Sequence, residues 1–592
     1  KVLIDNCQQE CVCHADQSME CRNHSCKPGQ VCKPVGGVLN CTDEPCHDVT
    51  CRPQETCKEQ GGQGVCVPNY NVTCWLWGDQ HYHSFDGWEF DFQGTCDYVL
   101  ATVGCPGVSA EGLTPFTVTT KNENRGNPAV SYVKRVTVSA LGTNISIHKN
   151  EFGRVRVNGV LTALPVSVAG GRISVIHGPG KAILMTDFGL QVSYDWDCRV
   201  EVTLSSSYHN VVCGLCGNMD QNASNDQVFP NGTLAPSIPT WGGSWQVPGW
   251  DPFCWNDCQG SCPMCSEDQQ EKYKGPNFCG PLAPGSAGPF ASCHAHLPPE
   301  NVFKGCLLDV CMGGGAQDTL CQALAAYAAA CQAAGVVIGD WRTQAGCEIL
   351  CPNNSHYELC GPRCPASCPS PSRPSTPAVC EGPCTEGCQC NDGFVLSADQ
   401  CVPLDGGCGC WANDTYYEAG SEFWADGTCS RLCRCEPGDG SLVCTPASCG
   451  VGKECALLSS GQYGCQPVST AECQAWGDPH YVTLDGYRFD FQGTCEYLLS
   501  APCDTPPKGT ENFTVTVGNE HLGSQAVSYT HSVTLHVYGH ALTLSASWPR
   551  QIQVDGKVVN LPFQLGSRLH AYLSGNAVVV TTDFGLSLSF DT

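Results

Sequence analysis

The chain has 592 residues, 49 of them cysteine, and its 30 basic and 57 acidic residues give a formal net charge of −27. So many cysteines exclude the cytosol, where glutathione and thioredoxin keep thiols reduced, and indicate a secreted disulfide scaffold. The acidic balance excludes nucleic acid or an anionic membrane as the main partner, because both require clustered lysine and arginine.

The first part of the chain, residues 1–73, is predicted to form cysteine-rich strand modules. It begins without the apolar region of a signal peptide. A cysteine pattern near its start recurs later in the chain; the matching positions are Cys7, Cys11, Cys13, Cys21 and Cys26, then Cys429, Cys433, Cys435, Cys444 and Cys449. The run from Cys26 to Cys41 is echoed from Cys51 to Cys66, which indicates a local duplication.

A long motif from Cys74, CWLWGDQHYHSFDGWEFDFQGTCDYVL, recurs from Cys473 as CQAWGDPHYVTLDGYRFDFQGTCEYLL, so the chain contains a tandem repeat. Within each copy, runs such as RVTVSA and RVRVNG alternate apolar and polar residues with the period of a β-strand. Asn158-Gly159 and its counterpart Asp555-Gly556 lie between such runs and predict two-residue hairpins, whose turns need positive φ. We therefore predict antiparallel β-sandwiches over residues 74–254 (the first copy) and 473–592 (the second copy).

Between the copies lie cysteine-rich stretches. Residues 255–351 are predicted to form short helices held by disulfides. Their apolar segment Leu320–Gly339 approaches the length of a membrane span, but cysteines and glutamines interrupt it, so a buried, disulfide-tied helix is expected. Residues 352–408 hold a Pro/Ser-rich hinge and too little apolar material to fold without cross-links, and residues 409–472 are predicted to form a small strand module.

The motifs WGDxHY, FDFQGTC and CGLCGN, in this order, resemble the von Willebrand factor type D domain. The resemblance implies a mainly β, multidomain, disulfide-rich array of D-domain sandwiches at 74–254 and, truncated, at 473–592. The other stretches resemble the usual companions of this domain: an eight-cysteine module at 255–351, a trypsin-inhibitor-like module at 352–408 and a strand module at 409–472. Residues 1–73 are then the end of a preceding D assembly.

The second copy stops before a CGLCGN of its own, so we expect the chain to be a fragment. Three of its cysteines correspond to cysteines of the first copy: Cys473, Cys495 and Cys503 match Cys74, Cys96 and Cys105. We expect the partners of these three to lie past Thr592, and every other cysteine to pair within the chain.

The loop CGLCGNMDQNASND, from Cys213 to Asp226, is a candidate calcium site. Closely spaced oxygen side chains suit a hard cation, which takes roughly six to eight oxygen ligands. The resemblance implies that this loop binds calcium together with the FDG aspartate; the residues carried over are Asp86, Asn218, Asp220, Asn222, Asn225 and Asp226. The alternative is an Asx-rich turn that satisfies its own backbone. Asn222 is also a glycosylation acceptor, and we expect it to stay largely bare.

Asp478-Pro479, within WGDPH, is a candidate self-cleavage site. Proline nitrogen carries no hydrogen and becomes a better leaving group once protonated, so the Asp478 carboxylate can attack its own carbonyl and form a cyclic anhydride. His480 is the candidate proton donor. The resemblance implies this cleavage, because GDPH is cleaved in mucin-type relatives; the alternative is an ordinary turn. The first copy has Gln80 in place of proline, and we expect Asp79-Gln80 to stay intact.

Cys213-x-x-Cys216 has the spacing of a redox motif, but its place in a cysteine-rich β domain favours structural disulfides over thiol exchange or zinc. The same interpretation applies to Cys262/Cys265, Cys388/Cys390 and Cys408/Cys410. His81 and His83 form a candidate metal pair, but Val482 replaces His83 in the second copy, which argues against a shared site. The trypsin-inhibitor-like module is expected to be a spacer rather than a protease inhibitor.

The chain also offers N-x-S/T glycosylation acceptors, which agree with an extracellular glycoprotein. The candidates are Asn23, Asn40, Asn71, Asn144, Asn231, Asn353, Asn413 and Asn512. No Ser/His/Asp arrangement suited to an external substrate is found.

The leading hypothesis is a secreted structural glycoprotein of mucus or extracellular matrix, not an enzyme. Calcium would hold each sandwich, and the array would cross-link with mucins, other D-domain glycoproteins or itself, as a homo-oligomer or through covalent partners. IgG Fc is a partner that the resemblance alone implies. The alternatives are an adhesion protein of the zonadhesin or tectorin type and a disulfide isomerase-like activity at Cys213 and Cys216.

Overall fold

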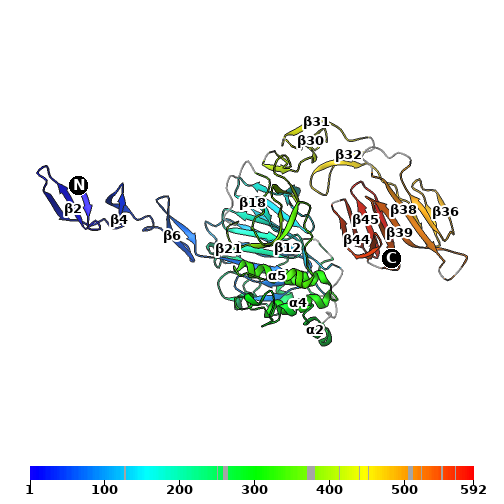
Figure 1. Cartoon of the computed structure of the whole chain (residues 1–592), viewed down its shortest axis with the longest axis horizontal. Coiled ribbons are helices and arrows are strands. Elements are labelled where there is room, and N and C mark those ends of the chain that lie inside the picture. The colour runs from blue at the N-terminus through cyan, green and yellow to red at the C-terminus, as the bar shows by residue number, and fades with distance from the viewer. Residues whose placement is uncertain are drawn as a thin grey trace. The chain divides into compact units, whose positions relative to one another are not determined.

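The computed structural model of the protein (Figure 1) describes residues 1–125, 129–249, 251, 253–257, 265–369, 380–412, 414–438, 440–450, 453–503, 511–521, 523, 525–548, 551–566 and 568–591. The described chain is mainly β, as predicted, and the paired strands of both copies run antiparallel. It divides into two compact units, residues 1–449 with 455–465, and residues 450–454 with 466–592. Cys262 and the glycosylation candidate Asn413 lie outside the described residues.

Residues 1–68 form two small disulfide-tied sheets. Their strands are β1 (Val2–Ile4), β2 (Gln9–Cys13), β3 (Met19–Asn23), β4 (Gln30–Val35), β5 (Val38–Asp43), β6 (Glu55–Gln60) and β7 (Gln63–Pro68). The first sheet has the order β3-β2-β1-β5-β4, and the second pairs β6 with β7. Cys26 pairs with Cys41 and Cys51 with Cys66, so the duplicated cysteine pattern is also a duplicated disulfide.

The first copy is a sandwich of two antiparallel sheets, as predicted. Its strands are β8 (Asn71–Trp77), β9 (His81–His83), β10 (Glu89–Asp91), β11 (Asp97–Val103), β12 (Phe116–Glu123), β13 (Tyr132–Ala140), β14 (Thr143–His148), β15 (Arg154–Val157), β16 (Val160–Ala163), β17 (Val166–Val168), β18 (Ile173–Gly178), β19 (Lys181–Thr186), β20 (Leu190–Tyr194), β21 (Val200–Ser205) and β22 (Val212–Cys213). One sheet has the order β10-β9-β8-β21-β20-β19-β18-β17, and the other β16-β15-β14-β13-β12-β11-β22.

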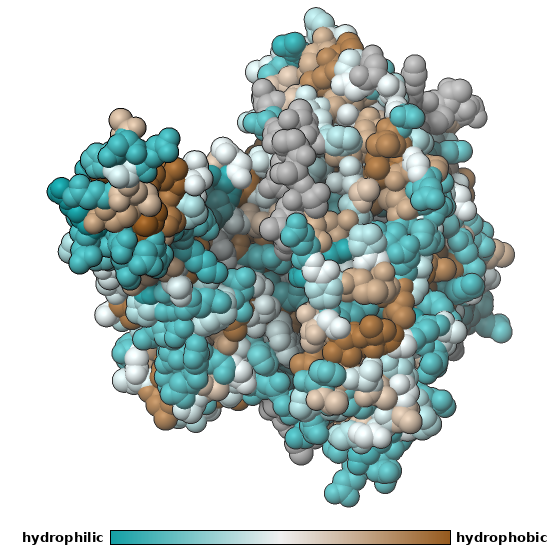
Figure 2. All heavy atoms as spheres, turned by 60° about the vertical axis from the view of Figure 1, so that its left-hand side comes forward, coloured by the Kyte–Doolittle hydropathy of each residue, from teal (hydrophilic) through white to brown (hydrophobic). Residues whose placement is uncertain are grey.

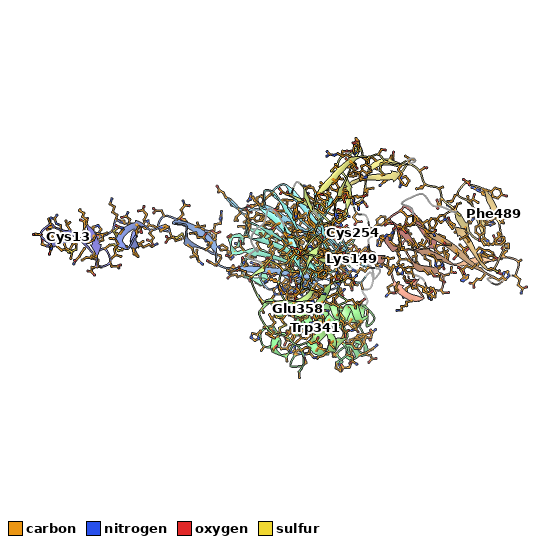
Figure 3. All side chains as sticks on the ribbon, turned by 45° about the horizontal axis from the view of Figure 1, so that its top comes forward. Cys13, Lys149, Cys254, Trp341, Glu358 and Phe489 are labelled. Carbon is orange, nitrogen blue, oxygen red and sulfur yellow. A yellow bond between two sulfur atoms is a disulfide. The ribbon has the colours of Figure 1, made fainter. Side chains whose placement is uncertain are left out.

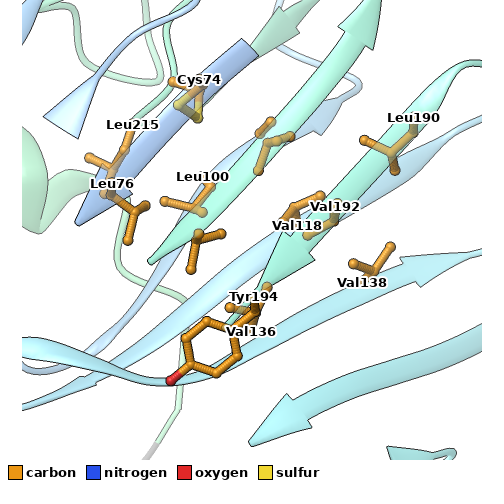
Figure 4. Packing of buried hydrophobic residues seen from close by; sticks show 14 of the residues in the cluster. Cys74, Leu76, Leu100, Val118, Val136, Val138, Leu190, Val192, Tyr194 and Leu215 are labelled. Atoms are coloured by element: carbon orange, nitrogen blue, oxygen red, sulfur yellow. A yellow bond between two sulfur atoms is a disulfide. The ribbon is translucent and has the colours of Figure 1, made fainter. Parts of the chain in front are cut away.

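The core of the first copy lies between these sheets and includes Leu76, Val118 and Tyr194 (Figure 4). Alternate residues of a strand point to one face, and burial alternates along the whole of β12. Asn158 and Gly159 have φ of 49° and 87°, which confirms the predicted hairpin between β15 and β16.

A short helical segment covers one end of the first copy. Its elements are η1 (Ser206–Tyr208), η2 (Ala223–Asn225) and α1 (Ile238–Ser244). Trp241 of α1 packs edge-on against Phe90 and is fully buried. Disulfides fix this segment: Cys74 pairs with Cys216, Cys96 with Cys254 (labelled in Figure 3) and Cys105 with Cys213.

Residues 265–347 form the predicted helical module, which lies against the first copy (Figure 1). Its helices are α2 (Glu267–Tyr273), η3 (Gly280–Leu282), α3 (Ala291–His294), α4 (Glu300–Met312), α5 (Gln317–Ala333) and α6 (Trp341–Ala345). The described disulfides are Cys265–Cys311, Cys279–Cys306, Cys293–Cys331 and Cys321–Cys347. The apolar segment forms much of α5, and no helix among the described residues has the length and apolarity needed to span a membrane.

The two modules that follow consist of short hairpins. Their strands are β23 (Ser355–Gly361), β24 (Thr385–Cys390), β25 (Phe394–Ser397), β26 (Gln400–Pro403), β27 (Cys410–Ala412), β28 (Thr415–Tyr417), β29 (Glu422–Trp424), β30 (Arg431–Cys435), β31 (Leu442–Pro446), β32 (Lys453–Leu457) and β33 (Tyr463–Pro467). They pack on the β15–β16 hairpin, where Arg154 binds both carboxylate oxygens of Glu418 at 2.9 and 2.8 Å. Cys388 and Cys390 bond to Cys351 and Cys401 rather than to each other.

The second copy repeats the strands β8 to β20 of the first, and its described strands form three antiparallel sheets rather than two. They are β34 (Gln474–Trp476), β35 (His480–Val482), β36 (Arg488–Asp490), β37 (Glu496–Ser500), β38 (Phe513–Glu520), β39 (Tyr529–Val537), β40 (His540–Ser545), β41 (Gln551–Val554), β42 (Lys557–Asn560), β43 (Phe563–Leu565), β44 (Leu569–Ser574), β45 (Ala577–Thr582) and β46 (Ser587–Asp591). Phe489 (Figure 3) is 40% exposed, whereas its counterpart Phe90, which Trp241 contacts, is 6% exposed.

Five described cysteines are unpaired: Cys13, Cys198, Cys473, Cys495 and Cys503. The expectation that only the last three lack a partner within the chain was therefore wrong. The counterpart of Cys13 (Figure 3) is Cys435, which bonds to Cys410, 25 residues earlier. A partner at that separation from Cys13 would lie before residue 1 of the given sequence. Cys198 is buried among apolar side chains, beside Val130 and Tyr132.

The surface is predominantly hydrophilic on the face shown in Figure 2, where polar side chains separate the apolar patches. This agrees with the large net charge of −27. All the described glycosylation candidates are exposed; they are Asn23, Asn40, Asn71, Asn144, Asn231, Asn353 and Asn512. Glycans at these positions would therefore displace no part of the core.

Candidate functional site

The candidate calcium loop connects β22 to η2 and is fixed at its start by disulfides. Cys213 and Cys216 do not bond to each other; they pair with Cys105 and Cys74, which tie the loop to both sheets. The Phe85 N–H donates to the Cys216 carbonyl at 2.9 Å, and this brings the FDG turn beside the loop.

Asp86 joins the FDG turn to the loop. Its Oδ1 accepts from the Gln221 N–H at 2.6 Å and its Oδ2 from the Asp220 N–H at 3.3 Å. Asp220 Oδ2 in turn accepts from the side-chain amides of Asn218 at 3.0 Å and Asn225 at 2.7 Å. Asp86, Asn218, Asp220 and Asn225 therefore converge.

Asp226 closes the same site. Its Oδ2 accepts a hydrogen bond from the Ser84 hydroxyl at 2.6 Å, and the residue is only 3% exposed. Burial raises the pKa of Asp226 to about 7, with the nearby Asp86 carboxylate adding to the rise. A Cβ at Gly217 would lie 2.3 Å from Asp226 Oδ1, so this loop position requires glycine.

The loop fits a hard cation. The side-chain oxygen of Asn225 is buried without a hydrogen-bond partner, and three carboxylates, Asp86, Asp220 and Asp226, lie together at partly or fully buried positions. Oxygen ligands of this kind suit calcium. Asn222 differs from the other candidates, because its Oδ1 accepts from the Ser224 N–H at 3.3 Å and so begins η2.

The histidine pair does not form a common metal site. The His83 ring stacks on Trp75 with centroids 4.8 Å apart, whereas His81 lies among carboxylates. His81 Nε2 is 2.9 Å from Asp79 Oδ1 and 2.7 Å from Asp309 Oδ1, and its Nδ1 is 2.6 Å from Asp91 Oδ1.

Asp309, which comes from α4, was not identified from the sequence. It is 1% exposed, and Asp79 is fully buried, so α4 covers the Asp79-Gln80-His81 turn. Burial raises the pKa of Asp79 well above its usual range, and Asp309 adds to this. Burial opposes the charged form of His81, but the Asp309 and Asp79 carboxylates outweigh it and raise the pKa of His81 well above its usual value.

The second copy has the same turn in an exposed setting. His480 Nε2 is 2.9 Å from Asp478 Oδ1 and its Nδ1 is 2.6 Å from Asp490 Oδ1, as in the first copy. The side chains of Asp478 and His480 are 39% and 42% exposed. The hydrogen bond to Asp490 raises the pKa of His480.

The peptide conformation differs between the two turns. Gln80 has a φ of 69°, in the left-handed region, and the proline ring holds φ near −65°. Pro479 therefore cannot adopt the backbone of Gln80, and the two copies have different turns around a shared aspartate and histidine.

A glutamine contacts each turn, and no prediction from the sequence assigned it a role. Gln93 Nε2 donates to the Asp79 carbonyl at 2.5 Å, and Gln492 Nε2 donates to the Asp478 carbonyl at 2.5 Å. The identical separation along the chain in both copies was the available signal.

Comparison with known families gives an ordered set of domains. The von Willebrand factor type D domain matches residues 74–233 and 473–592, and the C8 domain matches residues 278–348. The trypsin inhibitor like cysteine rich domain matches residues 351–410, and the TILa domain matches residues 2–42 and 409–466. Together these four families account for most of the chain.

Several curated proteins resemble the whole chain. The human (Homo sapiens) IgGFc-binding protein is 77% identical over 591 residues, which is 100% of this chain and 11% of that protein. Human alpha-tectorin is 35% identical over 97% of this chain and 25% of its own length. Zonadhesin of Oryctolagus cuniculus is 36% identical over 99% of this chain and 24% of its own length. The chain thus spans between about a tenth and a quarter of these relatives.

Proposed function

We propose, from the premise that this chain belongs to the family of extracellular proteins built from von Willebrand factor type D, C8 and trypsin-inhibitor-like domains, that it is part of a secreted structural glycoprotein of mucus or matrix. The observation that carries this proposal is the tandem arrangement of small modules, of which those before the second copy are closed by their own disulfides. Such an array is suited to forming a network.

Calcium is the proposed cofactor of the first copy. Asp86, Asp220, Asp226 and the side-chain oxygens of Asn218 and Asn225 would hold the ion, which would neutralise the carboxylates and fix the loop to the FDG turn. Support comes from the unpartnered Asn225 oxygen and from the close approach at Gly217. Calorimetric unfolding with calcium and with a chelator tests this proposal: an unchanged midpoint would remove it.

Self-cleavage at Asp478-Pro479 is the second part of the proposal. The Asp478 carboxylate attacks its own main-chain carbonyl carbon, and the carbon–nitrogen bond to Pro479 breaks as that nitrogen takes a proton. His480 lies next to the carboxylate and is the proposed proton donor. The products are a cyclic anhydride at Asp478 and a free proline amine, and water then opens the anhydride to two carboxyl groups.

Mass spectrometry of the secreted chain tests the cleavage. A peptide with Pro479 at its N-terminus supports it, whereas an intact peptide across Asp478-Pro479 in all conditions removes it. Asp79-Gln80 serves as an internal comparison and is expected to remain intact.

The partners proposed are mucins, other D-domain glycoproteins or further copies of this chain, joined covalently or through glycans. IgG Fc is also a proposed partner, because the relative with 77% identity is named for binding it. Electrophoresis of the secreted protein without and with reducing agent tests covalent assembly, since disulfide-linked species disappear on reduction. Retention of the protein on immobilised Fc tests binding to IgG Fc. An adhesion role of the zonadhesin or tectorin type remains the alternative, supported by those relatives.

The isomerase-like alternative loses its structural basis. It requires a reducible bond between Cys213 and Cys216, but each of these residues is bonded to a distant cysteine.

A further inference from the structure

The hairpin register places Gln492 opposite Asp478. β35 and β36 are antiparallel, with His480 paired to Asp490. Continuing this register by two residues on each strand brings position 492 across from position 478. The Phe491 N–H also donates to the Pro479 carbonyl at 3.4 Å, which keeps the two segments together beyond the paired residues.

The orientation of the Gln492 amide is fixed by two backbone groups. The Ser528 N–H can only donate, and it contacts Gln492 Oε1 at 2.8 Å. The Asp478 carbonyl can only accept, and it contacts Gln492 Nε2 at 2.5 Å. Oxygen and nitrogen of a glutamine are assigned from such partners, so the NH₂ group faces the Asp478 carbonyl.

The same arrangement occurs in the first copy. Gln93 Nε2 contacts the Asp79 carbonyl at 2.5 Å, and the Ser131 N–H contacts Gln93 Oε1 at 2.7 Å. The arrangement therefore belongs to the fold of the repeat, and it survives the change from Gln80 to proline and the different turn that follows from it.

The contacted carbonyl is the group that reacts in the proposed cleavage. When the Asp478 carboxylate adds to its own carbonyl carbon, the double bond opens and the electron pair moves to the carbonyl oxygen. A fixed N–H donor at that oxygen stabilises the developing charge more than it stabilises the neutral carbonyl, which lowers the barrier.

We propose that Gln492 is the oxyanion donor of the Asp478-Pro479 cleavage, held in orientation by the Ser528 backbone. This inference rests on the proposed self-cleavage. The electron pair on the oxygen then re-forms the carbonyl, the bond to the proline nitrogen breaks, and the proton from His480 completes the amine. Gln492 donates a hydrogen bond throughout and transfers no proton.

The test compares cleavage rates of the 592-residue chain with Gln492→Ala and Gln492→Glu, across a range of pH. Removing an oxyanion donor typically lowers a rate by about 10²–10³-fold; because Gln492 is exposed to water, we expect a loss of at least about tenfold for Gln492→Ala. Quantitative mass spectrometry of the peptide that begins at Pro479 gives the rate.

Gln492→Glu separates a donor from a structural contact. Above the pKa of an ordinary glutamate, about 4.3, the carboxylate cannot donate and faces the carbonyl with like charge. Below that pH the carboxyl regains an O–H donor. Relative to wild type at each pH, Gln492→Glu is therefore expected to recover on acidification, whereas Gln492→Ala is not.

Gln93→Glu is the matched control, because it alters the same contact in the copy whose bond is not expected to break. It should leave cleavage at Asp478-Pro479 unchanged, and near-ultraviolet circular dichroism checks the fold of every variant. If the wild type is cleaved and both Gln492 variants are cleaved at the wild-type rate, the oxyanion role is overturned and self-cleavage stands. Equal slowing of both variants at every pH would make Gln492 a structural residue. An uncleaved wild type would remove both proposals.

Discussion

At the scale of single residues, His81 shows how burial and charge combine. It is 8% exposed, and its two ring nitrogens lie within 2.9 Å of carboxylates from β10, from α4 and from its own turn. Other charged or titratable groups near this cluster are Glu89, Arg125, Tyr132 and Cys198. Because the pKa values of both His81 and Asp79 are raised, this cluster binds more protons in the native state than in the unfolded chain.

This proton excess predicts that the unfolding free energy contributed by the cluster falls as the pH rises. The decline begins above the unfolded pKa of aspartate, about 3.9, and continues past that of histidine, about 6.5, until His81 loses its proton in the native state. Asp309→Asn removes a cause of both shifts, so its urea-unfolding free energy should depend less on pH than that of wild type. Each pKa unit corresponds to about 1.4 kcal/mol. Asp405→Asn, at an exposed position, is the control, and parallel pH curves for wild type and Asp309→Asn would contradict the prediction.

A second prediction concerns the candidate calcium loop. Asp220 accepts hydrogen bonds from the side chains of two other candidate ligands, whereas the side chain of Asn222 is exposed and bonds only to Ser224. Asp220→Ala should therefore abolish the rise in melting temperature on adding calcium, because a ligand stabilises the folded state only when its free concentration exceeds its dissociation constant. Asn222→Ala should retain that rise. Scanning calorimetry with calcium and with chelator measures both, and equal responses of the two variants would show that the ion is held elsewhere.

At the scale of elements, the contact between α4 and the first copy depends on one glycine. A Cβ at Gly305 would lie 3.0 Å from His81 Nε2 and 3.0 Å from the Trp77 ring. The absence of a side chain lets α4 approach closely enough for Asp309, one turn further on, to reach His81.

Gly305→Val should separate α4 from the first copy. Inserting carbon atoms into a packed contact usually costs about 1–3 kcal/mol, and here it also removes the Asp309 contact. Ala333→Val, at the exposed end of α5, is the matched control and should change stability little. Limited proteolysis between the two domains measures the effect; equal digestion of both variants would mean that the contact contributes no stability.

The sequence predicted most elements because their signals are local. Asn158-Gly159 and Asp555-Gly556 require positive φ, and the alternating runs identified the sandwich strands. Asp309 was missed because it reaches His81 across 228 residues through packing that no local pattern encodes. Gln492 was missed because its role appears only when the hairpin register is known. The sequence showed that proline replaces Gln80 in the second copy, but not that the turns differ. That difference follows from the Gln80 φ of 69°, which only the structure gives.

At the scale of the whole molecule, the unpaired cysteines differ in exposure. Cys13, Cys495 and Cys503 are exposed, whereas Cys198 is buried, where burial raises its pKa well above the usual range. In the isolated 592-residue chain, iodoacetamide should therefore label the first three before unfolding and reach Cys198 only after unfolding, because the thiolate is the reactive form. Peptide mapping before and after denaturant reads this out; native labelling of Cys198 would show that its surroundings open in solution.

The disulfide Cys74–Cys216 spans a sequence separation of 142 residues and connects the entry of the first copy directly to the candidate calcium loop. Tension applied to the ends of the chain would pass through these two sulfur atoms and bypass the β-strands between them. At about 3.4 Å per extended residue, the disulfide prevents a pulling force from extending nearly 500 Å of backbone between the two cysteines. A fibre made of such units would resist stretching through its covalent bridges, while the sandwich inside each loop bears no load.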